Sequence, residues 1–188
     1  MADHEFHLAI GELIKPNDIE PKDFPKSTPL IILKDKACDK GGHTIPLYSS
    51  SASVETPIEL CNVDMLIEVG GKAKVIVEIE ESNVTPVHIF GKFFVTALSS
   101  EYGDNEGNRK PFSPPVLFIQ ILKAVDKPKS LKPSQWDRIA DSIRSILISP
   151  LHEKKWEYQL FQGSKAEFVG DGSKGKLITS TIKEHLEQ

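Results

Sequence analysis

The stretch from Cys61 to Glu80 constrains the fold most, because apolar and polar side chains alternate on both sides of a Gly-Gly pair. Alternation with a period of two is typical of strands that bury one face, and glycine permits the positive φ of a tight hairpin turn. A two-residue Gly70-Gly71 loop would place the two apolar rows on opposite faces of the hairpin. We therefore predict a three-residue loop, Gly70 to Lys72, which pairs Val69 with Ala73.

This register predicts which side chains lie opposite each other on the second face of the hairpin. Asp64 lies directly across from Glu78, Glu80 shares their face, and Glu68 meets Lys74 as an opposite-charge pair. Carboxylates this close repel by on the order of 1 kcal/mol or more at about 4 Å. A hard divalent cation held by oxygen ligands would remove the repulsion. The alternative is a solvated face whose acids point to water, and spacing alone does not decide between the two.

The rest of the chain reads as one alternation of helices and strands, without an internal repeat. With 188 residues, a single domain with one sizeable core is expected. The pattern predicts an α/β fold, a mixed central β-sheet flanked by helices. The predicted elements are a helix at 4–15, a strand at 30–33, a surface loop at 35–53 with an edge strand at 44–48, a helix at 86–102, a polar loop at 103–115, a buried central strand at 116–122, a helix at 133–148, a strand at 156–161, a hairpin turn at 170–175 and a final segment of unassigned type.

Composition narrows the class of protein further. No apolar run approaches the roughly 20 residues of a membrane-spanning helix, and the N-terminus is acidic, so we expect a soluble cytoplasmic protein without membrane contact. Cys38 and Cys61 show no metal-ligand spacing, which argues against a disulfide framework or a structural zinc site. The net charge of −4 does not indicate nucleic-acid binding, although local basic clusters remain compatible with it.

The segments 63–68, 70–72 and 75–80 resemble the core hairpin of the restriction-endonuclease-like, PD-(D/E)XK nuclease superfamily. In that family an Asp on one strand is followed, across a turn, by an apolar strand that ends in acid, any residue, Lys. The predicted helix and buried strand that follow are in the family's order, so the resemblance covers 61–122. It implies a restriction-endonuclease-like core of α-β-β-β-α-β order within a single domain, 1–188. The tail, 150–188, has no assigned role.

The resemblance also implies the site residues. Asp64 and Glu78 would be metal-binding carboxylates, joined by Glu80, which stands where the family has its Lys. Lys92, on the following helix, is the candidate replacement for that Lys, whereas His88 is more typical of a surface position. An upstream acid, Glu55 or Glu59, sometimes completes such sites. Glu81 has the opposite parity and stays outside unless a bulge shifts it.

The function implied is a metal-dependent hydrolase, an endonuclease that uses Mg²⁺ (or Mn²⁺) to cleave DNA phosphodiester bonds. A restriction-type enzyme cuts both strands, so a homodimer is expected. The alternative is a catalytically inactive nucleic-acid-binding or assembly module on the same fold, with relict acids. A third possibility, a small-molecule α/β enzyme or an unrelated scaffold, would gain support if Asp64 and Glu78 lay on opposite sheet faces.

Overall fold

Two long parallel strands form the centre of the computed structural model, which describes residues 4–49, 58–82, 85–124, 133–147, 155–170 and 172–188. The elements are α1 (Glu5–Leu13), α2 (Pro16–Ile19), β1 (Leu30–Lys34), β2 (Ile45–Tyr48), β3 (Glu59–Val63), β4 (Met65–Val69), β5 (Lys72–Glu80), α3 (Pro86–Ala97), β6 (Glu101–Gly103), β7 (Arg109–Lys123), α4 (Pro133–Leu147), β8 (Trp156–Gly163), α5 (Lys165–Phe168) and α6 (Ser173–Leu186).

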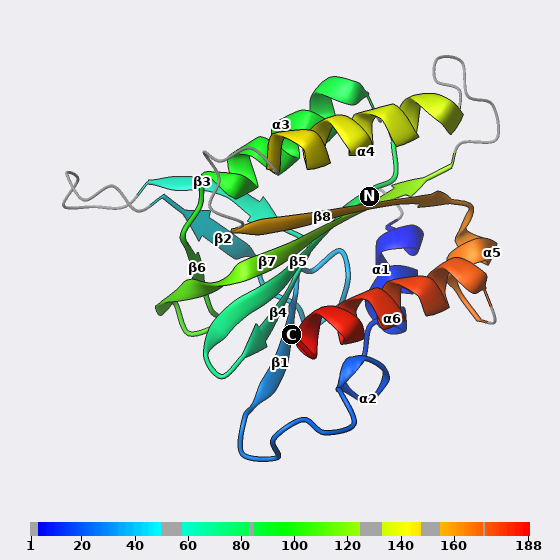
Figure 1. Ribbon diagram of the computed structural model, residues 1–188. Coiled ribbons are helices and arrows are strands. Elements are labelled where there is room, and N and C mark those ends of the chain that lie inside the picture. The colour runs from blue at the N-terminus through cyan, green and yellow to red at the C-terminus, as the bar shows by residue number, and fades with distance from the viewer. Residues whose placement is uncertain (1–3, 50–57, 83–84, 125–132, 148–154, 171) are drawn as a thin grey trace.

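The described strands form one mixed sheet. β1, β4 and β5 pair antiparallel in that order, and β7 then runs parallel to β5 on one side and to β8 on the other. The first residues of β7 pair instead with β6, which leads on to β2 and β3 as an antiparallel extension. Figure 1 shows this sheet as the middle layer of a single α/β domain, as predicted.

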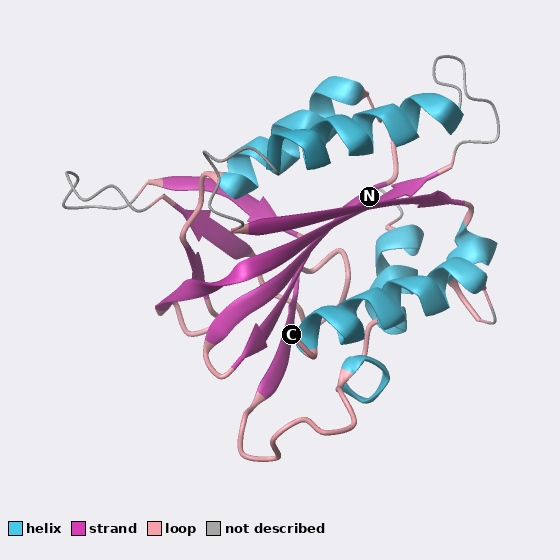
Figure 2. Ribbon diagram, viewed as in Figure 1, coloured by secondary structure: helices cyan, strands magenta, loops and turns pink. Residues whose placement is uncertain are grey.

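Helices cover both faces of the sheet, and the alternation of the strands decides which residues meet which helices (Figure 2). One face packs on α3 and α4, with a core that includes Leu66, Ile76, Phe118, Ile89, Phe93, Ile139 and Ile143. The other face packs on the helices at the two ends of the chain, with a core that includes Met65, Val77, Ile119, Phe6, Ile10, Ile178 and Ile182. Strand 116–122 lies between β5 and β8, and its two faces contribute to the cores on both sides of the sheet, which confirms the predicted central strand.

The hairpin has the predicted register only from Met65 to Ile67, and its turn differs from the predicted one. The predicted first strand is divided at Asp64, since residues up to Val63 form β3 and pair with β2, so Asp64 does not lie across from Glu78 in the ladder. Gly70 and Gly71, at φ 59° and 79°, form a two-residue loop that pairs Val69 with Lys72. A register shift between Ile67 and Glu68 then restores the pairs predicted for Met65, Leu66 and Ile67. A bulge thus supplies the one-residue offset that we had assigned to a longer loop.

The predicted Glu68–Lys74 pair does not form in the bulged hairpin. Glu68 lies opposite Ala73 instead and is buried. Its carboxylate accepts a hydrogen bond of 2.7 Å from the Tyr102 hydroxyl and one of 3.0 Å from Lys110 Nζ. A buried carboxylate requires such partners, and they come from the β6–β7 hairpin rather than from the neighbouring strand.

Four other element predictions were wrong. The helix from Pro86 ends at Ala97 rather than near 102, and the polar segment 103–115 forms a β6–β7 hairpin turn and the start of β7. Strand β2 is not an edge, because it pairs with both β3 and β6. The glycine-rich segment 170–175 leads into α6 instead of a hairpin, and a Cβ at Gly175 would lie 2.0 Å from the Phe168 carbonyl oxygen.

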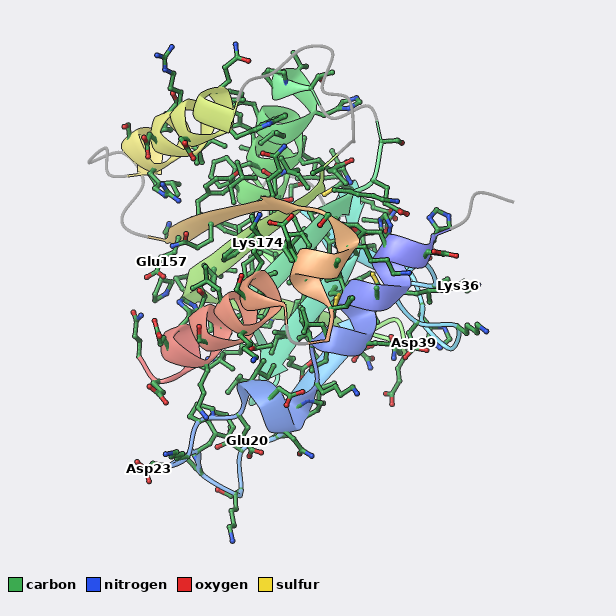
Figure 3. All side chains as sticks on the ribbon, turned by 90° about the vertical axis from the view of Figure 1, so that its right-hand side faces the viewer. Glu20, Asp23, Lys36, Asp39, Glu157 and Lys174 are labelled. Atoms are coloured by element: carbon green, nitrogen blue, oxygen red, sulfur yellow. The ribbon has the colours of Figure 1, made fainter. Side chains whose placement is uncertain are left out.

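The C-terminal tail completes the sheet and one of its helical layers. β8 pairs with β7 from Val116 to Lys123, and α6 packs beneath this part of the sheet. Figure 3 views the layer directly, with α6, α5 and α1 in front of the sheet and Glu157 of β8 above α6. The Glu157 carboxylate lies 3.1 Å from Nδ1 of the buried His185. Within the described residues, none of the helices has the length and apolarity needed to cross a membrane.

Candidate metal centre

The candidate site lies where the central strand β5 ends, close to the beginnings of α3 and α1. Glu78 and Glu80 belong to the last residues of β5, and Glu78 lies beside Gln120 in the parallel ladder with β7. Ile76 belongs to the core beneath α3 and α4, and Glu78 and Glu80 share its parity along β5. The α3 side of the sheet therefore receives both carboxylates at the end of the strand.

Asp64 occupies a bend between β3 and β4, the point at which the chain passes from one part of the sheet to the other. Its backbone carbonyl accepts a hydrogen bond of 2.8 Å from the Asp35 amide. Its side-chain Oδ2 accepts one of 2.7 Å from the backbone N–H of Ile79. This bond holds the Asp64 carboxylate beside Ile79, the residue between Glu78 and Glu80.

Glu78 is the most constrained carboxylate of the site. Its side chain is fully buried, and Oε2 accepts a hydrogen bond of 3.0 Å from Lys92 Nζ. Oε1 is also buried, and within the part of the chain that the structure describes it has no hydrogen-bond partner. Burial, reinforced by the negative charge of Asp64, raises the pKa of Glu78 well above its usual range. The position therefore favours a proton or a cation on Glu78.

Glu80 and Lys92 complete the predicted group. Lys92 projects from α3 with 41% of its side chain exposed, and its ammonium contacts Glu78. Glu80 is half-buried, and this burial raises its pKa against the opposing charge of Lys92. The charges of Lys92 and Asp64 both act on Glu80. Hydrogen bonds join Lys92 to Glu78 and Asp64 to the Ile79 backbone, and Glu80 lies two residues after Glu78 on the same side of β5.

Sequence reasoning missed two residues beside this group, His7 and Glu81. His7 is buried in the first turns of α1, with Nδ1 2.9 Å from Glu81 Oε2 and Nε2 3.8 Å from Asp64 Oδ1. Glu81 follows β5 on the opposite parity, as predicted, and therefore contacts α1 instead of α3. Burial of Glu81 acts to raise its pKa, but hydrogen bonds from His7 and Lys123 outweigh it and lower the pKa.

The other residues considered from the sequence are exposed or lie outside the described residues. His88 is an exposed residue in the first turn of α3, and its charge acts on Glu80. Glu59 is exposed, and its carboxylate accepts a hydrogen bond of 3.2 Å from the Asn62 side chain. Glu55 lies outside the described residues.

Gln120 connects the candidate site to the elements around it. The side chain is fully buried, and Nε2 donates a hydrogen bond of 3.3 Å to the Ile89 carbonyl of α3. Oε1 accepts one of 2.6 Å from the Tyr158 hydroxyl of β8. This chain of contacts fixes α3, and with it Lys92, relative to the two central strands.

The donor set fits a hard divalent cation. Asp64, Glu78 and Glu80 offer carboxylate oxygens only, which Mg²⁺ and Mn²⁺ prefer as ligands. The partnerless Oε1 of Glu78 is the strongest sign, because a buried carboxylate oxygen without a donor is costly unless a cation or a proton binds it. Comparison of the chain with protein-family models, with curated proteins and with solved structures gave no match.

Proposed function

We propose that the protein is an endonuclease of the restriction-type PD-(D/E)XK class, which uses Mg²⁺ or Mn²⁺ to hydrolyse DNA phosphodiester bonds. The observation that carries this proposal is the convergence of Asp64, the buried Glu78 and the Lys92 ammonium at one end of the central strands. Two acids and a lysine at this place are the set that the sequence resemblance implies, with the lysine coming from α3 instead of position 80.

Each residue has a role in this proposal. Asp64, Glu78 and Glu80 would hold the cation, which when bound polarises a phosphate oxygen and increases the acidity of a coordinated water. Lys92 would supply a positive charge and hydrogen-bond donors beside the carboxylates, for the phosphate or the attacking water. Because Lys92 binds Glu78 at 3.0 Å, it also neutralises that acid when no cation is bound.

The proposed nuclease class also implies the substrate, duplex DNA, and the assembly. Cleavage of both strands of a duplex requires two sites, so the proposed active species is a homodimer acting on DNA in the cytoplasm. The runner-up is a module on the same fold that binds nucleic acid or a partner protein but no longer cleaves. The hydrogen bond of 3.0 Å from a partly exposed Lys92 to Glu78 favours cleavage, because it keeps a lysine ammonium beside the carboxylates where a phosphate would bind.

A DNA cleavage assay tests the proposal. A mixed pool of supercoiled and linear DNA is incubated with Mg²⁺ or Mn²⁺ and wild-type protein, Asp64→Ala or Asp18→Ala. Asp18 is an exposed acid of α2, so its substitution controls for the loss of one negative charge. We expect wild type and Asp18→Ala to cleave. Asp64→Ala should cleave at least 100-fold more slowly, which corresponds to about 3 kcal/mol of lost transition-state stabilisation.

Two results would contradict the proposal. One is full activity of a folded Asp64→Ala variant, which would place any cleavage elsewhere. The other is no cleavage by wild type with either cation across DNA of diverse sequence, which would favour the non-catalytic module. Circular dichroism of all three proteins separates loss of activity from loss of folding.

A further inference from the structure

A second group of ligand-type side chains lies next to the carboxylates, at the start of α1. His4 is the residue before the helix, and His7 lies in its first turns, so their spacing of three places both rings on one side. Their ring centroids are 5.4 Å apart. Glu81, just after β5, faces both rings, and one ligand atom from each of the three residues lies within 4.8 Å of the other two.

The two carboxylate oxygens of Glu81 have different partners. Oε1 accepts a hydrogen bond of 3.1 Å from Lys123 Nζ and one of 3.3 Å from the Phe6 backbone N–H. Oε2 lies 2.9 Å from Nδ1 of His7 and 3.9 Å from Nδ1 of His4. Oε1 is thus held by a lysine and a backbone amide, and Oε2 is hydrogen-bonded to His7 Nδ1, a contact that a metal ion would replace.

The opposite nitrogen of His7 has the surroundings expected for a metal ligand. Nε2 lies 3.8 Å from Asp64 Oδ1, so a metal on Nδ1 would leave the Nε2–H near a carboxylate. Metal-binding histidines usually have such a carboxylate beside the second nitrogen, which fixes the tautomer and the ring. His7 is buried, whereas His4 is 51% exposed, so the group is open to solvent on the His4 side.

We propose that His4, His7 and Glu81 form a binding site for a transition-metal ion, with Zn²⁺ as the ion that fits best. Two imidazoles and one carboxylate are a ligand set that zinc uses when it keeps a position open for water. Tetrahedral ligands at about 2.1 Å from the metal lie about 3.4 Å apart. This separation falls between the 2.9 Å from His7 Nδ1 to Glu81 Oε2 and the 3.9 Å from His4 Nδ1 to the same oxygen. The mixed nitrogen and oxygen donors distinguish this site from the all-oxygen centre at Glu78.

Titration of untagged protein with Co²⁺ and Zn²⁺, without DNA or magnesium, tests this site. Tetrahedral Co²⁺ gives visible absorption bands, and Zn²⁺ added afterwards should remove them by displacement. The variants are His4→Ala, which changes an exposed residue and should fold normally, and His43→Ala as a control at another exposed histidine. A third variant, Glu78→Gln, separates this site from the carboxylate centre.

We expect wild type, His43→Ala and Glu78→Gln to show one equivalent of tetrahedral Co²⁺ that Zn²⁺ displaces, and His4→Ala to bind this equivalent at least tenfold more weakly. Unchanged binding by His4→Ala would overturn the proposal, as would absence of binding by wild type. A near-ultraviolet charge-transfer band from Co²⁺–thiolate bonds would overturn it too, because it would assign the metal to Cys38 or Cys61. Zinc binding is measured apart from cleavage, so its result does not depend on the proposed nuclease activity.

Discussion

At the scale of single residues, the central feature is the balance of charge around Glu78. Burial disfavours its carboxylate form, and the charge of Asp64 disfavours it further, so the pKa of Glu78 is raised. Lys92 opposes both effects through its hydrogen bond to Oε2. Removal of the Asp64 charge should therefore stabilise the metal-free protein, whereas removal of Lys92 should destabilise it.

Lys92→Met should destabilise the metal-free protein by about 1–3 kcal/mol, because it leaves a buried carboxylate without its counter-charge. The cost stays below that of a fully buried ion pair, since Lys92 is 41% exposed and Glu78 can take up a proton. In a Glu78→Gln background the same substitution should cost less than about 0.5 kcal/mol. Urea denaturation of the four proteins measures this cycle, and equal costs in both backgrounds would show that the two side chains are not coupled.

Some site residues were predictable from local pattern, and others were not. Alternation along the hairpin predicted Asp64 opposite Glu78, whereas Asp64 lies in the bend before β4 and reaches the Ile79 backbone from there. Lys92 was named from the family resemblance, and its bond to Glu78 depends on how α3 packs on the sheet. His7 and Glu81 are 74 residues apart, and their contact depends on how α1 packs on the sheet. The spacing of His4 and His7 was a visible signal, but nothing near them in the sequence indicates a carboxylate partner.

At the scale of elements, the position of α1 determines where His7 lies. The helix packs closely on the loop after β1, since a Cβ at Gly11 would lie 2.0 Å from the Cys38 carbonyl oxygen. Backbone on both sides of this contact leaves no flexible side chain to move away. Glycine at this position therefore permits α1 to dock beside Asp64.

Gly11→Ala should destabilise the protein by about 1–3 kcal/mol or more, because the added methyl group overlaps backbone. Gly91→Ala in α3 is the matched control, since a Cβ there has nothing within 4 Å. Alanine should stabilise that exposed helical position by up to about 1 kcal/mol. Thermal unfolding of both variants separates the clash from helix propensity, and stabilisation by both substitutions would contradict the described packing of α1.

The elements that the sequence predicted well were those with a strong local period. The helix at 133–147 has apolar residues at helical spacing, the buried strand of β7 is an apolar run, and the hairpin strands alternate. β6 and α6 were missed because tertiary contacts decide them. β6 has three residues and exists by pairing with β2 and β7, and α6 contains a glycine that packs against Phe168.

At the scale of the whole molecule, the C-terminal tail belongs to the domain and is not an appendage. β8 extends the parallel part of the sheet, and Ile178 and Ile182 of α6 enter the same core as Phe6 and Ile10 of α1. The first and last helices thus cover one face together. Loss of the packing of α6 should weaken the layer that holds His7.

Ile178→Ala should destabilise the whole domain by about 2–5 kcal/mol, as expected for a cavity in a closely packed core. Leu177→Ala is its neighbour on α6 and 53% exposed, so it should change stability by no more than about 0.5 kcal/mol. Denaturant unfolding followed by circular dichroism compares the pair. If both substitutions had the same small effect, α6 would not be part of the domain core.

The central claim, a divalent-cation centre at Asp64 and Glu78, is tested most directly by thermal unfolding with and without Mg²⁺. Wild type, Glu78→Gln and the exposed control Glu184→Gln are compared in the absence of DNA. An ion that binds only the folded state at about 100 times its Kd adds about 2.7 kcal/mol of stability, a rise of several degrees in Tm for a chain of this size. We predict this rise for wild type and Glu184→Gln and its loss in Glu78→Gln. An equal rise in all three proteins, or none in wild type, would contradict the account.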